Sequence, residues 1–495
     1  MKPSAELFEL IKALTSNEKR YFKLYASLQK GSKNYLNLFK AIDSMKVYDE
    51  KLIRIIYSRE KFSMNLAYTK NYLHKLIFKS LISYNEGKYA DMKLAGLLSQ
   101  CRILFDKSLY RQYFRMLKTG KMLAVKQERY SYLLEFLELE RQLTKKEELS
   151  KNDIDKIFKE KNEVLDKLKL INSNKRAVNL LFKYQRLNGK ARSRSSFEET
   201  EKITETLTAE KGKESVPVTA QESYYMAMSL LHSIRGEEEK SFNFAVKRNN
   251  VITENPDIFG SMLFDNKNDS NVMMILSASE AGMHKKALRM LREFGELLKS
   301  KEADINYKFA FAETGLNYCT DTGDKKYFEK YLSGTEALLD GYRNKITVNT
   351  HNYLYFRLAG YFFAAGNYPE ALRIINLLYK SGYMKYSPFI EPYTKMLNVL
   401  IHYELGNYKL LKYLIHSAVK FLKSRNSYYN TESSVLKIVR ELSGIKKEEH
   451  RKKKYLTSLE IFSDLKNTEY EKNAFFYIDY VKWIKGKLSA VLIKN

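Results

Sequence analysis

The chain has 495 residues, a formal net charge of +28, 6 Pro and 2 Cys. A chain of this length does not fold around one compact core, so we expect several domains or an array of repeats. Two cysteines exclude a disulfide framework, and the uncharged run Leu358–Pro369 is far shorter than the roughly 18 residues of a membrane span. We expect a cytoplasmic protein without a signal peptide or membrane segment.

The positive charge favours a nucleic acid, an anionic lipid or an acidic protein as partner. Lys outnumbers Arg by 64 to 22, whereas base recognition favours the bidentate Arg fork. Abundant Lys, Asn, Ile and Tyr also fit an AT-rich coding sequence, so composition bias is the competing explanation. The basic residues concentrate in the N-terminal half and the C-terminal tail, and residues 221–350 are slightly acidic.

Residues 1–88 are predicted to form five helices, because apolar residues recur at helical spacing behind good capping residues. The capping signals are Ser4, the pair Thr15 and Glu18, Ser32, Asp49 and Ser63. The fifth helix is long, and its polar face carries Lys70, His74, Lys75 and Lys79. Two interpretations stay open: a helix-turn-helix relative with this helix in a major groove, or a helical cap with lysines toward solvent.

Residues 89–190 continue as helical hairpins, with one turn near Ser108. Between Ile154 and Ile171 apolar residues follow a heptad spacing. This spacing fits either a coiled-coil arm or packing against the predicted helix 130–143 of the same chain.

Residues 191–220 interrupt the apolar spacing. The run NGKARSRSS is basic and poor in apolar residues, and Gly212 and Pro217 follow it. We predict a surface loop and a domain boundary here. Lys190, Arg192 and Arg194 then either contact phosphates or remain solvated.

The most informative stretch is YLYFRLAGYFFAAGNYPEALRIINLLYKSG, from Tyr353 to Gly382. Each half carries one apolar stripe at helical spacing, with Gly366 between the halves and Pro369 opening the second. Two antiparallel helices with a tight turn are therefore predicted. The stretch resembles a tetratricopeptide (TPR) repeat, which has a Gly in the turn and an Ala, here Ala371, five residues later.

Similar turn glycines recur through residues 221–425, at Gly236, Gly282, Gly323, Gly366 and Gly406. The resemblance implies an all-α fold: an α-solenoid of degenerate TPR-like repeats between N-terminal and C-terminal helical caps. The phrase HYELGNYKLLKYLIHSAVKFLKS, His402–Ser424, also resembles uncharacterised bacterial helical-repeat proteins, which brings no known activity with it. No proline lies between Pro3 and Pro217, which favours helix in the first half as well.

In TPR proteins the first helix of each repeat lines a concave binding surface. The resemblance places these candidate partner-binding residues there: Tyr353, Phe356, Phe363, Tyr393, Met396, Tyr403, Glu280, Glu313 and Asp321. Aromatic residues bind peptides through buried area, and carboxylates select a basic partner. The competing explanation is that the aromatic residues pack on neighbouring helices.

Residues 426–495 are predicted to form a basic helical cap, in which HRKKKY, His450–Tyr455, is the densest cationic cluster. Across the chain the candidate anion contacts are Lys70, Lys75, Lys79, Arg192, Arg194, Arg451, Lys452, Lys453 and Lys454. Lysine contacts to phosphate would give binding without sequence preference.

Nucleotide-binding glycine motifs and the zinc-protease motif do not occur, and no two histidines lie one helical turn apart. We therefore expect no cofactor, no metal and no catalysis. The sequence favours a non-enzymatic scaffold that binds an unknown protein or peptide. The alternative is a sequence-nonspecific nucleic-acid-associated protein that uses the basic N-terminal half and the C-terminal tail.

Overall fold

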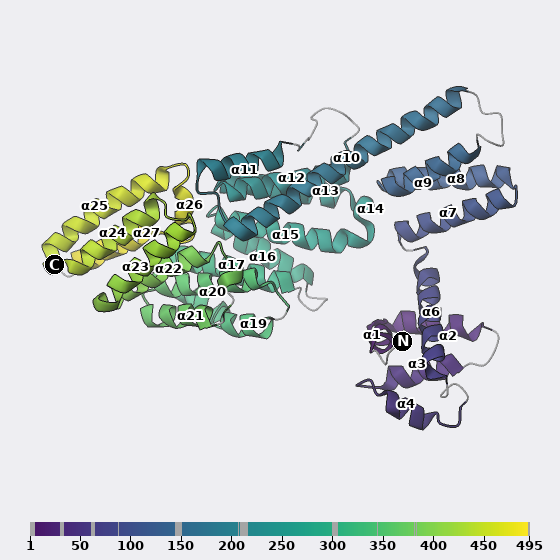
Figure 1. The fold of residues 1–495 in the computed structure, drawn as a ribbon, viewed down its shortest axis with the longest axis horizontal. Coiled ribbons are helices and arrows are strands. Elements are labelled where there is room, and N and C mark those ends of the chain that lie inside the picture. The colour runs from purple at the N-terminus through teal and green to yellow at the C-terminus, as the bar shows by residue number, and fades with distance from the viewer. Residues whose placement is uncertain are drawn as a thin grey trace. The chain divides into compact units, whose positions relative to one another are not determined.

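The computed structural model describes residues 5–29, 34–60, 65–87, 89–143, 151–205, 207, 216–298, 305–343, 345–380, 382 and 384–493. Helix accounts for 83% of the structure, and no strand occurs in these ranges, which confirms the all-α prediction. No helix within them has the length and apolarity that crossing a membrane requires. The chain divides into two compact units, Met1–Leu165 and Asp166–Asn495 (Figure 1).

Unit 1 begins with short helices and continues with longer ones. They are α1 (Glu6–Ala13), α2 (Ser16–Ser27), α3 (Asn34–Ser44), α4 (Glu50–Ile56), α6 (Leu66–Asn85), α7 (Ala90–Asp106), α8 (Tyr110–Lys126), α9 (Tyr130–Gln142) and the first part of α10 (Lys151–Asn188). The predicted capping box of Thr15 and Glu18 is present, and Asp49 caps α4. The predicted caps Ser4, Ser32 and Ser63 lie outside the described residues.

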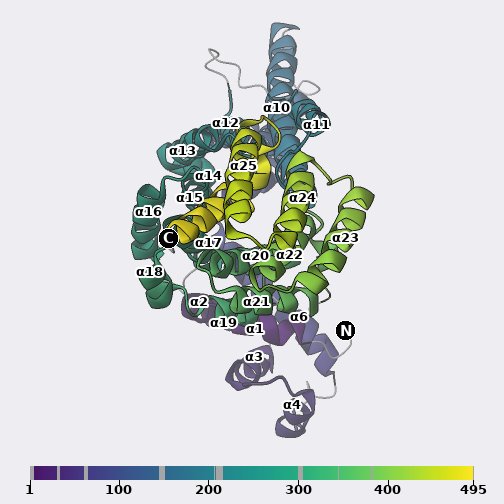
Figure 2. The ribbon, with the colours of Figure 1, turned by 90° about the vertical axis from the view of Figure 1, so that its left-hand side faces the viewer.

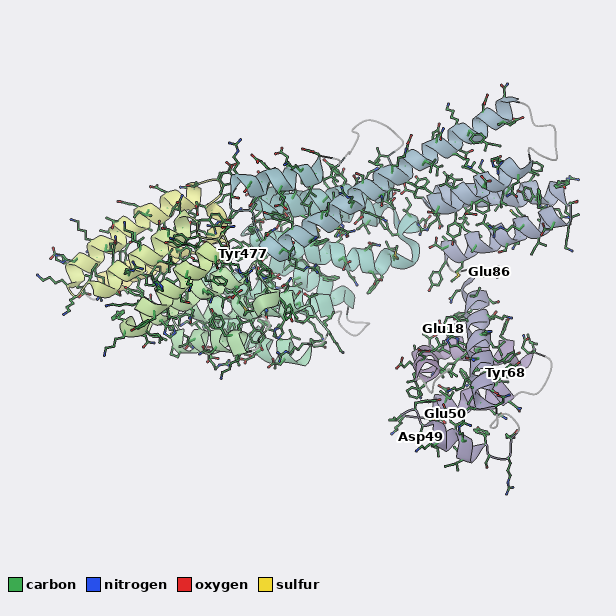
Figure 3. All side chains as sticks on the ribbon, viewed as in Figure 1. Glu18, Asp49, Glu50, Tyr68, Glu86 and Tyr477 are labelled. Carbon is green, nitrogen blue, oxygen red and sulfur yellow. The ribbon has the colours of Figure 1, made fainter. Side chains whose placement is uncertain are left out.

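The first five helices bury one apolar core that includes Phe22, Phe39 and Ile77. Lys70 of α6 points toward this core and not toward solvent. Its side chain is 4% exposed, and its Nζ lies 2.8 Å from Glu50 Oε2. Glu50 is labelled in Figure 3. The prediction that Lys70 is an anion contact is therefore wrong, because its charge is already neutralised within the unit.

The heptad-spaced residues at the start of α10 pack within the chain. Lys161 Nζ lies 2.8 Å from Glu138 Oε2 of α9, and Lys121 of α8 pairs with Glu160 at the same distance. Ile157 is buried between such pairs. Of the two interpretations, the structure supports packing against the preceding helices.

Unit 2 contains the rest of α10 and most of the remaining helices. They are α11 (Arg194–Thr204), α12 (Val218–Ile234), α13 (Glu238–Glu254), α14 (Pro256–Phe259), η2 (Gly260–Met262), α15 (Leu263–Glu280), α16 (His284–Leu298), α17 (Ile305–Thr322), α18 (Lys325–Tyr331), α19 (Thr335–Gly341), α20 (Val348–Ala364), α21 (Tyr368–Lys380), η3 (Met384–Tyr386), α22 (Glu391–Glu404), α23 (Tyr408–Ser424), α24 (Asn430–Gly444), α25 (Glu448–Asn467), α26 (Lys472–Phe475) and α27 (Tyr480–Ile493). From α20 to α25 each helix packs against the next one in the chain. In Figure 2 the helices of this unit follow one another around its interior.

The predicted turn glycines all adopt a left-handed conformation, with φ between +69° at Gly236 and +79° at Gly366. At Gly366 the helix ends with two backbone bonds, Gly366 N to Phe363 O and Asn367 N to Phe362 O. The same pair of bonds ends α7 at Ser108, which also has positive φ without being a glycine. The turn therefore recurs at a position that a search for glycines does not find.

Helices of unit 2 differ in how many of their sides are buried. In α21 one stripe is buried, and it includes Ala371, Ile375 and Leu378. In α20 and α22 buried residues lie all around the helix, and Met396 is fully enclosed. The first kind is amphipathic because one face meets water, whereas the second packs between other elements.

Residues 189–193 are not the predicted surface loop. Ala191 is fully buried, its N–H donates to Ile234 O, and its carbonyl accepts from Asn473 Nδ2. The helix α11 follows at once. The division between the two units falls inside α10, at Leu165, and not within 191–220. Gly212 lies outside the described residues.

Candidate ligand-binding cleft

Unit 2 encloses a cleft of about 880 Å³. Its walls come from α10, α12, α13, α15, α17 and α20, together with Phe476 and Tyr477 near the C-terminus. A volume of this size is in the range of ligand sites in proteins. The cleft is therefore the main candidate functional site of the unit.

Helical spacing explains which side chains reach the cleft. On α15 the lining residues Val272, Leu276 and Glu280 lie one helical turn apart, so they share one face. On α17 Phe309 and Glu313 do the same. Each helix therefore presents both apolar side chains and carboxylates to the cleft.

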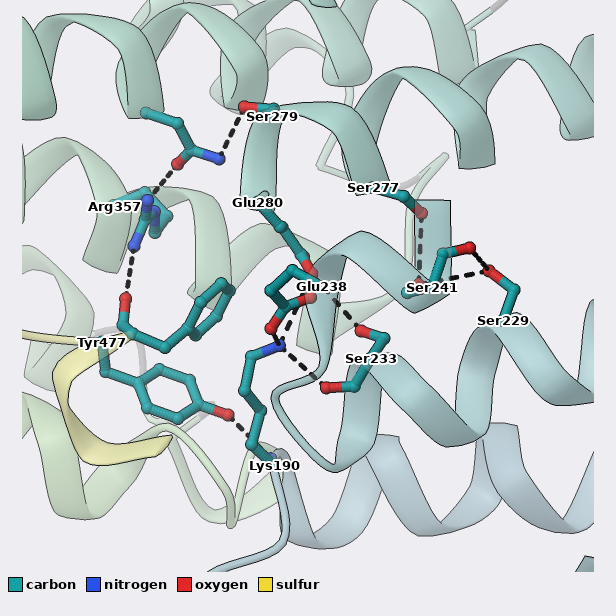
Figure 4. Close-up of polar contacts among 12 residues, drawn as sticks. Lys190, Ser229, Ser233, Glu238, Ser241, Ser277, Ser279, Glu280, Arg357 and Tyr477 are labelled. Carbon is teal, nitrogen blue, oxygen red and sulfur yellow. Dashed lines mark hydrogen bonds and ion pairs between the residues drawn. The ribbon is translucent and has the colours of Figure 1, made fainter. Parts of the chain in front are cut away.

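Lys190 forms the centre of a polar floor (Figure 4). Its Nζ lies 2.6 Å from Glu238 Oε1 and 3.5 Å from Glu280 Oε2, and it donates to Ser233 O at 2.9 Å. The ammonium also lies 3.9 Å from the centroid of the Phe476 ring. Only 5% of the Lys190 side chain is exposed, so this cation is held by the protein itself.

Three carboxylates share this floor with one ammonium. Burial, with the charge of Glu280, raises the pKa of Glu238 to about 7, although Lys190 opposes the shift. Burial and the charge of Glu280 also raise the pKa of Glu313 to about 7, against the pull of Arg357. No described residue is a geometric hydrogen-bond partner of Glu238 Oε2. The carboxyl groups of the floor therefore outnumber the cations beside them, so their negative charge is only partly neutralised.

Arg357 lies near this floor and lines a neighbouring cavity beside α27 (Tyr480–Ile493). Its guanidinium donates to Phe476 O at 3.2 Å and to the side chain of Asn317. Asn317 in turn donates to Ser279 Oγ at 3.2 Å. Figure 4 shows Arg357 within this network and Tyr477 below it, where the Tyr477 hydroxyl accepts from Lys190 N at 3.0 Å.

Basic side chains line the cleft as well. Lys183 and Arg186 of α10 and Lys345 line it, and all three side chains are exposed. Asn349 Nδ2 lies 3.5 Å from Arg186 O, which brings the stretch before α20 against the end of α10. The cleft thus joins a carboxylate floor to a cationic rim.

Three predicted partner-binding residues, Glu280, Glu313 and Tyr353, line this cleft. Phe356, Phe363 and Asp321 instead line a second cavity of about 480 Å³ beside α27. Phe356 is only 1% exposed, so its ring belongs to the core and not to an open surface.

The remaining three, Tyr393, Met396 and Tyr403, do not lie on an open groove, because the chain covers them. The Tyr393 ring stacks on Tyr477 with 3.8 Å between centroids. Tyr403 OH is 3.0 Å from Tyr455 OH, and Trp483 packs edge-on against its ring. The prediction that these residues contact a partner is corrected: the C-terminal segment occupies the place expected for a ligand.

The C-terminal segment is held there by polar bonds as well as by apolar packing. Trp483 Nε1 donates to Glu404 Oε1 at 2.6 Å, and Lys487 also bonds to Glu404. Lys482 Nζ donates to Asp321 O at 2.8 Å, near the end of α17. The predicted terminal cap is therefore an internal part of the unit.

Arg192 is the clearest correction among the predicted anion contacts. Its guanidinium lies 2.8 Å and 3.0 Å from the two oxygens of Glu432, 2.9 Å from Glu471 Oε2 and 3.1 Å from Tyr393 OH. The side chains of Arg192, Glu432 and Glu471 are 4%, 2% and 7% exposed. Glu471 also accepts from the first N–H groups of α24. Arg192 is therefore a buried structural cation.

The other predicted anion contacts lie nearer to solvent. Arg194 is 84% exposed and pairs with Glu198. In the HRKKKY cluster Lys453 is exposed, whereas Arg451, Lys452 and Lys454 are partly buried. Arg451 bonds to Ile445 O and Lys454 to Glu441. Lys75 and Lys79 are exposed on α6.

Sequence reasoning missed Lys190, Glu238 and Tyr477 as parts of one site. The residues that Lys190 contacts are up to 287 positions away, so no local spacing links them. The available signal was the run Gly189–Lys190, where positive φ at the glycine marks a backbone that must turn closely past a neighbour. Within the described ranges no group of His, Cys, Asp and Glu side chains is arranged to hold a metal ion.

No protein-family model, curated protein or solved structure matches this chain. Its class is therefore defined by its own structure. It is an all-helical protein whose second unit encloses an open cleft with apolar walls, a carboxylate floor and a basic rim.

Proposed function

We propose that this chain is a non-enzymatic interaction protein, and that unit 2 binds a segment of a protein partner in its cleft. One observation carries the proposal: an open space of about 880 Å³ is lined by faces of several successive helices. Such a space accepts an extended or helical peptide, with apolar side chains along the wall and polar groups at both ends.

The arrangement of the helices supports an α-solenoid of TPR-like repeats. Helices with one buried stripe alternate with helices buried all around, and left-handed turns join them. In such an array the inner helices present a continuous surface to a partner. The cleft residues Leu276, Phe309 and Tyr353 belong to three of these inner helices.

Chemistry at the cleft favours a partner with both apolar and charged groups. Phe309, Leu276 and Phe389 supply buried area for anchoring side chains. Glu280 and Glu313 complement a basic side chain, and Lys183 and Arg186 complement an acidic one. A peptide that carries both kinds of charge matches this lining.

The test fills the cleft without disturbing the core. Leu276→Trp places a large ring on the cleft wall, where Leu276 is only partly buried. Leu410→Trp on α23 is the matched control, because Leu410 is 45% exposed and does not line the cleft. Partners of wild type and both variants are recovered by affinity capture and identified by mass spectrometry, with and without nuclease.

The expected result is loss of specific protein partners with Leu276→Trp and their retention with Leu410→Trp, at equal helix content by circular dichroism. If both variants recover the same partners, the cleft is not the site that binds them. Loss of all partners on nuclease treatment would replace it with the nucleic-acid alternative.

A further inference from the structure

The N-terminal helices leave an unusual amount of apolar surface open. Among the described residues, ten large apolar side chains between positions 5 and 87 are exposed, as many as in the whole of 216–493. Several of them lie on α6, and Leu24 and Leu28 lie on α2, which packs beside α6. Exposed apolar surface of this density marks an interaction site more often than a plain solvent face.

On α6 the exposed side chains form a narrow seam. Tyr68, Tyr72, Lys75, Lys79 and Ile82 follow one another at alternating steps of four and three residues. This is the spacing of the contact positions in a two-helix coiled coil. Tyr68, labelled in Figure 3, is 69% exposed, Ile82 is 54% exposed and Tyr72 is 39% exposed.

The seam is also uniformly positive. Between Leu66 and Asn85 there is no Asp or Glu, and neither Lys75 nor Lys79 makes an ion pair with any described residue. The third lysine of the helix, Lys70, is turned inward and neutralised by Glu50. The charges that remain on the seam are therefore unbalanced within the unit.

We propose that the α6 seam binds an acidic amphipathic helix of a protein partner. Apolar side chains of that helix pack on Tyr68, Tyr72 and Ile82, and its carboxylates lie opposite Lys75 and Lys79. A second copy of the chain fits less well, because an antiparallel pair centred on Lys75 brings two lysines together.

A nucleic acid also fits less well than a protein helix. Phosphates complement Lys75 and Lys79, but they leave Ile82 and the exposed face of Phe78 in water. The helix has no Arg, the residue that most often reads base edges. An acidic amphipathic helix uses both the apolar area and the charge, whereas a nucleic acid uses only the charge.

The experiment uses the full chain and a fluorescein-labelled helical peptide with Leu at the seam positions and Glu opposite the two lysines. A second peptide carries Lys in place of Glu. Binding is measured by fluorescence anisotropy. The wild type is expected to bind the Glu peptide about tenfold or more tightly than the Lys peptide.

Two variants and one control separate the contributions of charge and of apolar contact to peptide binding. Lys75→Glu with Lys79→Glu should reverse the preference, so that the Lys peptide binds more tightly. Tyr68→Ser with Ile82→Ser should weaken the Glu peptide by about tenfold or more. Val47→Ser with Ile55→Ser removes apolar side chains that are 78% and 70% exposed elsewhere, and binding should be unchanged.

Three outcomes would overturn the proposal. The first is equal or absent binding of the two peptides to the wild type. The second is an equal loss of binding in the Val47 and Ile55 control. The third is binding of a DNA duplex, in place of the Glu peptide, that disappears with Lys75→Glu and Lys79→Glu.

Discussion

Two basic parts of the chain, residues 189–193 and the α6 seam, have opposite surroundings. In the first, Lys190 and Arg192 are almost fully buried, and each contacts two carboxylates. In the second, Lys75 and Lys79 are exposed and unpaired among the described residues. The same residue types stabilise the interior in one place and leave a charged surface in the other.

The difference depends on where the counter-charges come from. Glu432 and Glu471 lie 240 and 279 residues beyond Arg192, and the fold brings them together. Even one helix contains both kinds of lysine. Lys70 of α6 pairs with Glu50, whereas Lys75 pairs with no acidic residue in the part of the chain that the structure describes. The number of basic residues therefore predicts the net charge of the chain, but it does not predict which basic side chains are exposed.

The largest expected effect comes from removing the buried arginine. Arg192→Met leaves Glu432 and Glu471 buried without their cation, and unit 2 should lose about 3–5 kcal/mol of unfolding free energy. Thermal or urea unfolding followed by the fluorescence of Trp483, the single tryptophan, reports on this unit.

Arg194→Met is the matched control, two residues away. Arg194 is 84% exposed and pairs only with Glu198 in the next turn of its helix, so the change should stay within about 0.5 kcal/mol. Equal effects of the two substitutions would contradict the contrast between buried and exposed basic residues.

A smaller effect should separate two turn glycines. Gly236 and Gly366 have positive φ, so an Ala at either position carries a backbone cost of about 1–2 kcal/mol. At Gly236 the new Cβ would also overlap Asn473 Oδ1, whereas at Gly366 nothing lies in its way. Because Asn473 holds the buried segment at Ala191, Gly236→Ala should cost about 2–4 kcal/mol in total.

Thermal melting of both variants measures this difference. Similar melting temperatures would mean that Asn473 moves aside freely, and the buried segment would then be less firmly held than its hydrogen bonds indicate. An unchanged melting temperature for Gly366→Ala would mean that its turn is not strained.

The smallest expected effect is a pH dependence at the cleft floor. Burial and the neighbouring Glu280 raise the pKa of Glu313 from 4.5 to about 7 in the folded state. The folded state therefore binds this proton more tightly than the unfolded state, and stability falls as pH rises from 4.5 to 7. Glu313→Gln removes the dependence.

Above pH 7, the variant should be more stable than the wild type by on the order of 1 kcal/mol, and below pH 4.5 this advantage should disappear. Melting across this range measures the difference between the two proteins. His351 and His402, whose pKa values burial lowers, are present in both and cancel in the comparison. A difference that does not change with pH would mean that folding does not shift the pKa of Glu313.

Much of the local structure could be predicted from the sequence. Apolar residues at helical spacing, the capping pair Thr15 and Glu18, and the glycine at position 366 each act within a few residues, and each was found where expected. The turn near Ser108 was also expected, but its left-handed conformation and that of Glu128 were not, because a left-handed residue other than glycine leaves no mark in the sequence.

The candidate site was predictable only in part. The spacing of inner helices placed Glu280, Glu313 and Tyr353 on one surface, and these residues do line the cleft. The floor beneath them was not predictable, since Lys190 reaches it from a segment expected to be a loop. The same holds for Tyr477, which comes from the far end of the chain and covers Tyr393.

By itself, then, the sequence determined the features that depend on residues close together along the chain. These are the helices, their capping signals and the left-handed turns at glycine. Only the tertiary structure decided which charges are buried, which groove stays open and which one the chain fills itself. The physical reason is that an ion pair or an aromatic stack needs atoms within a few ångströms, and residues as distant as Arg192 and Glu471 meet only when the whole unit has folded.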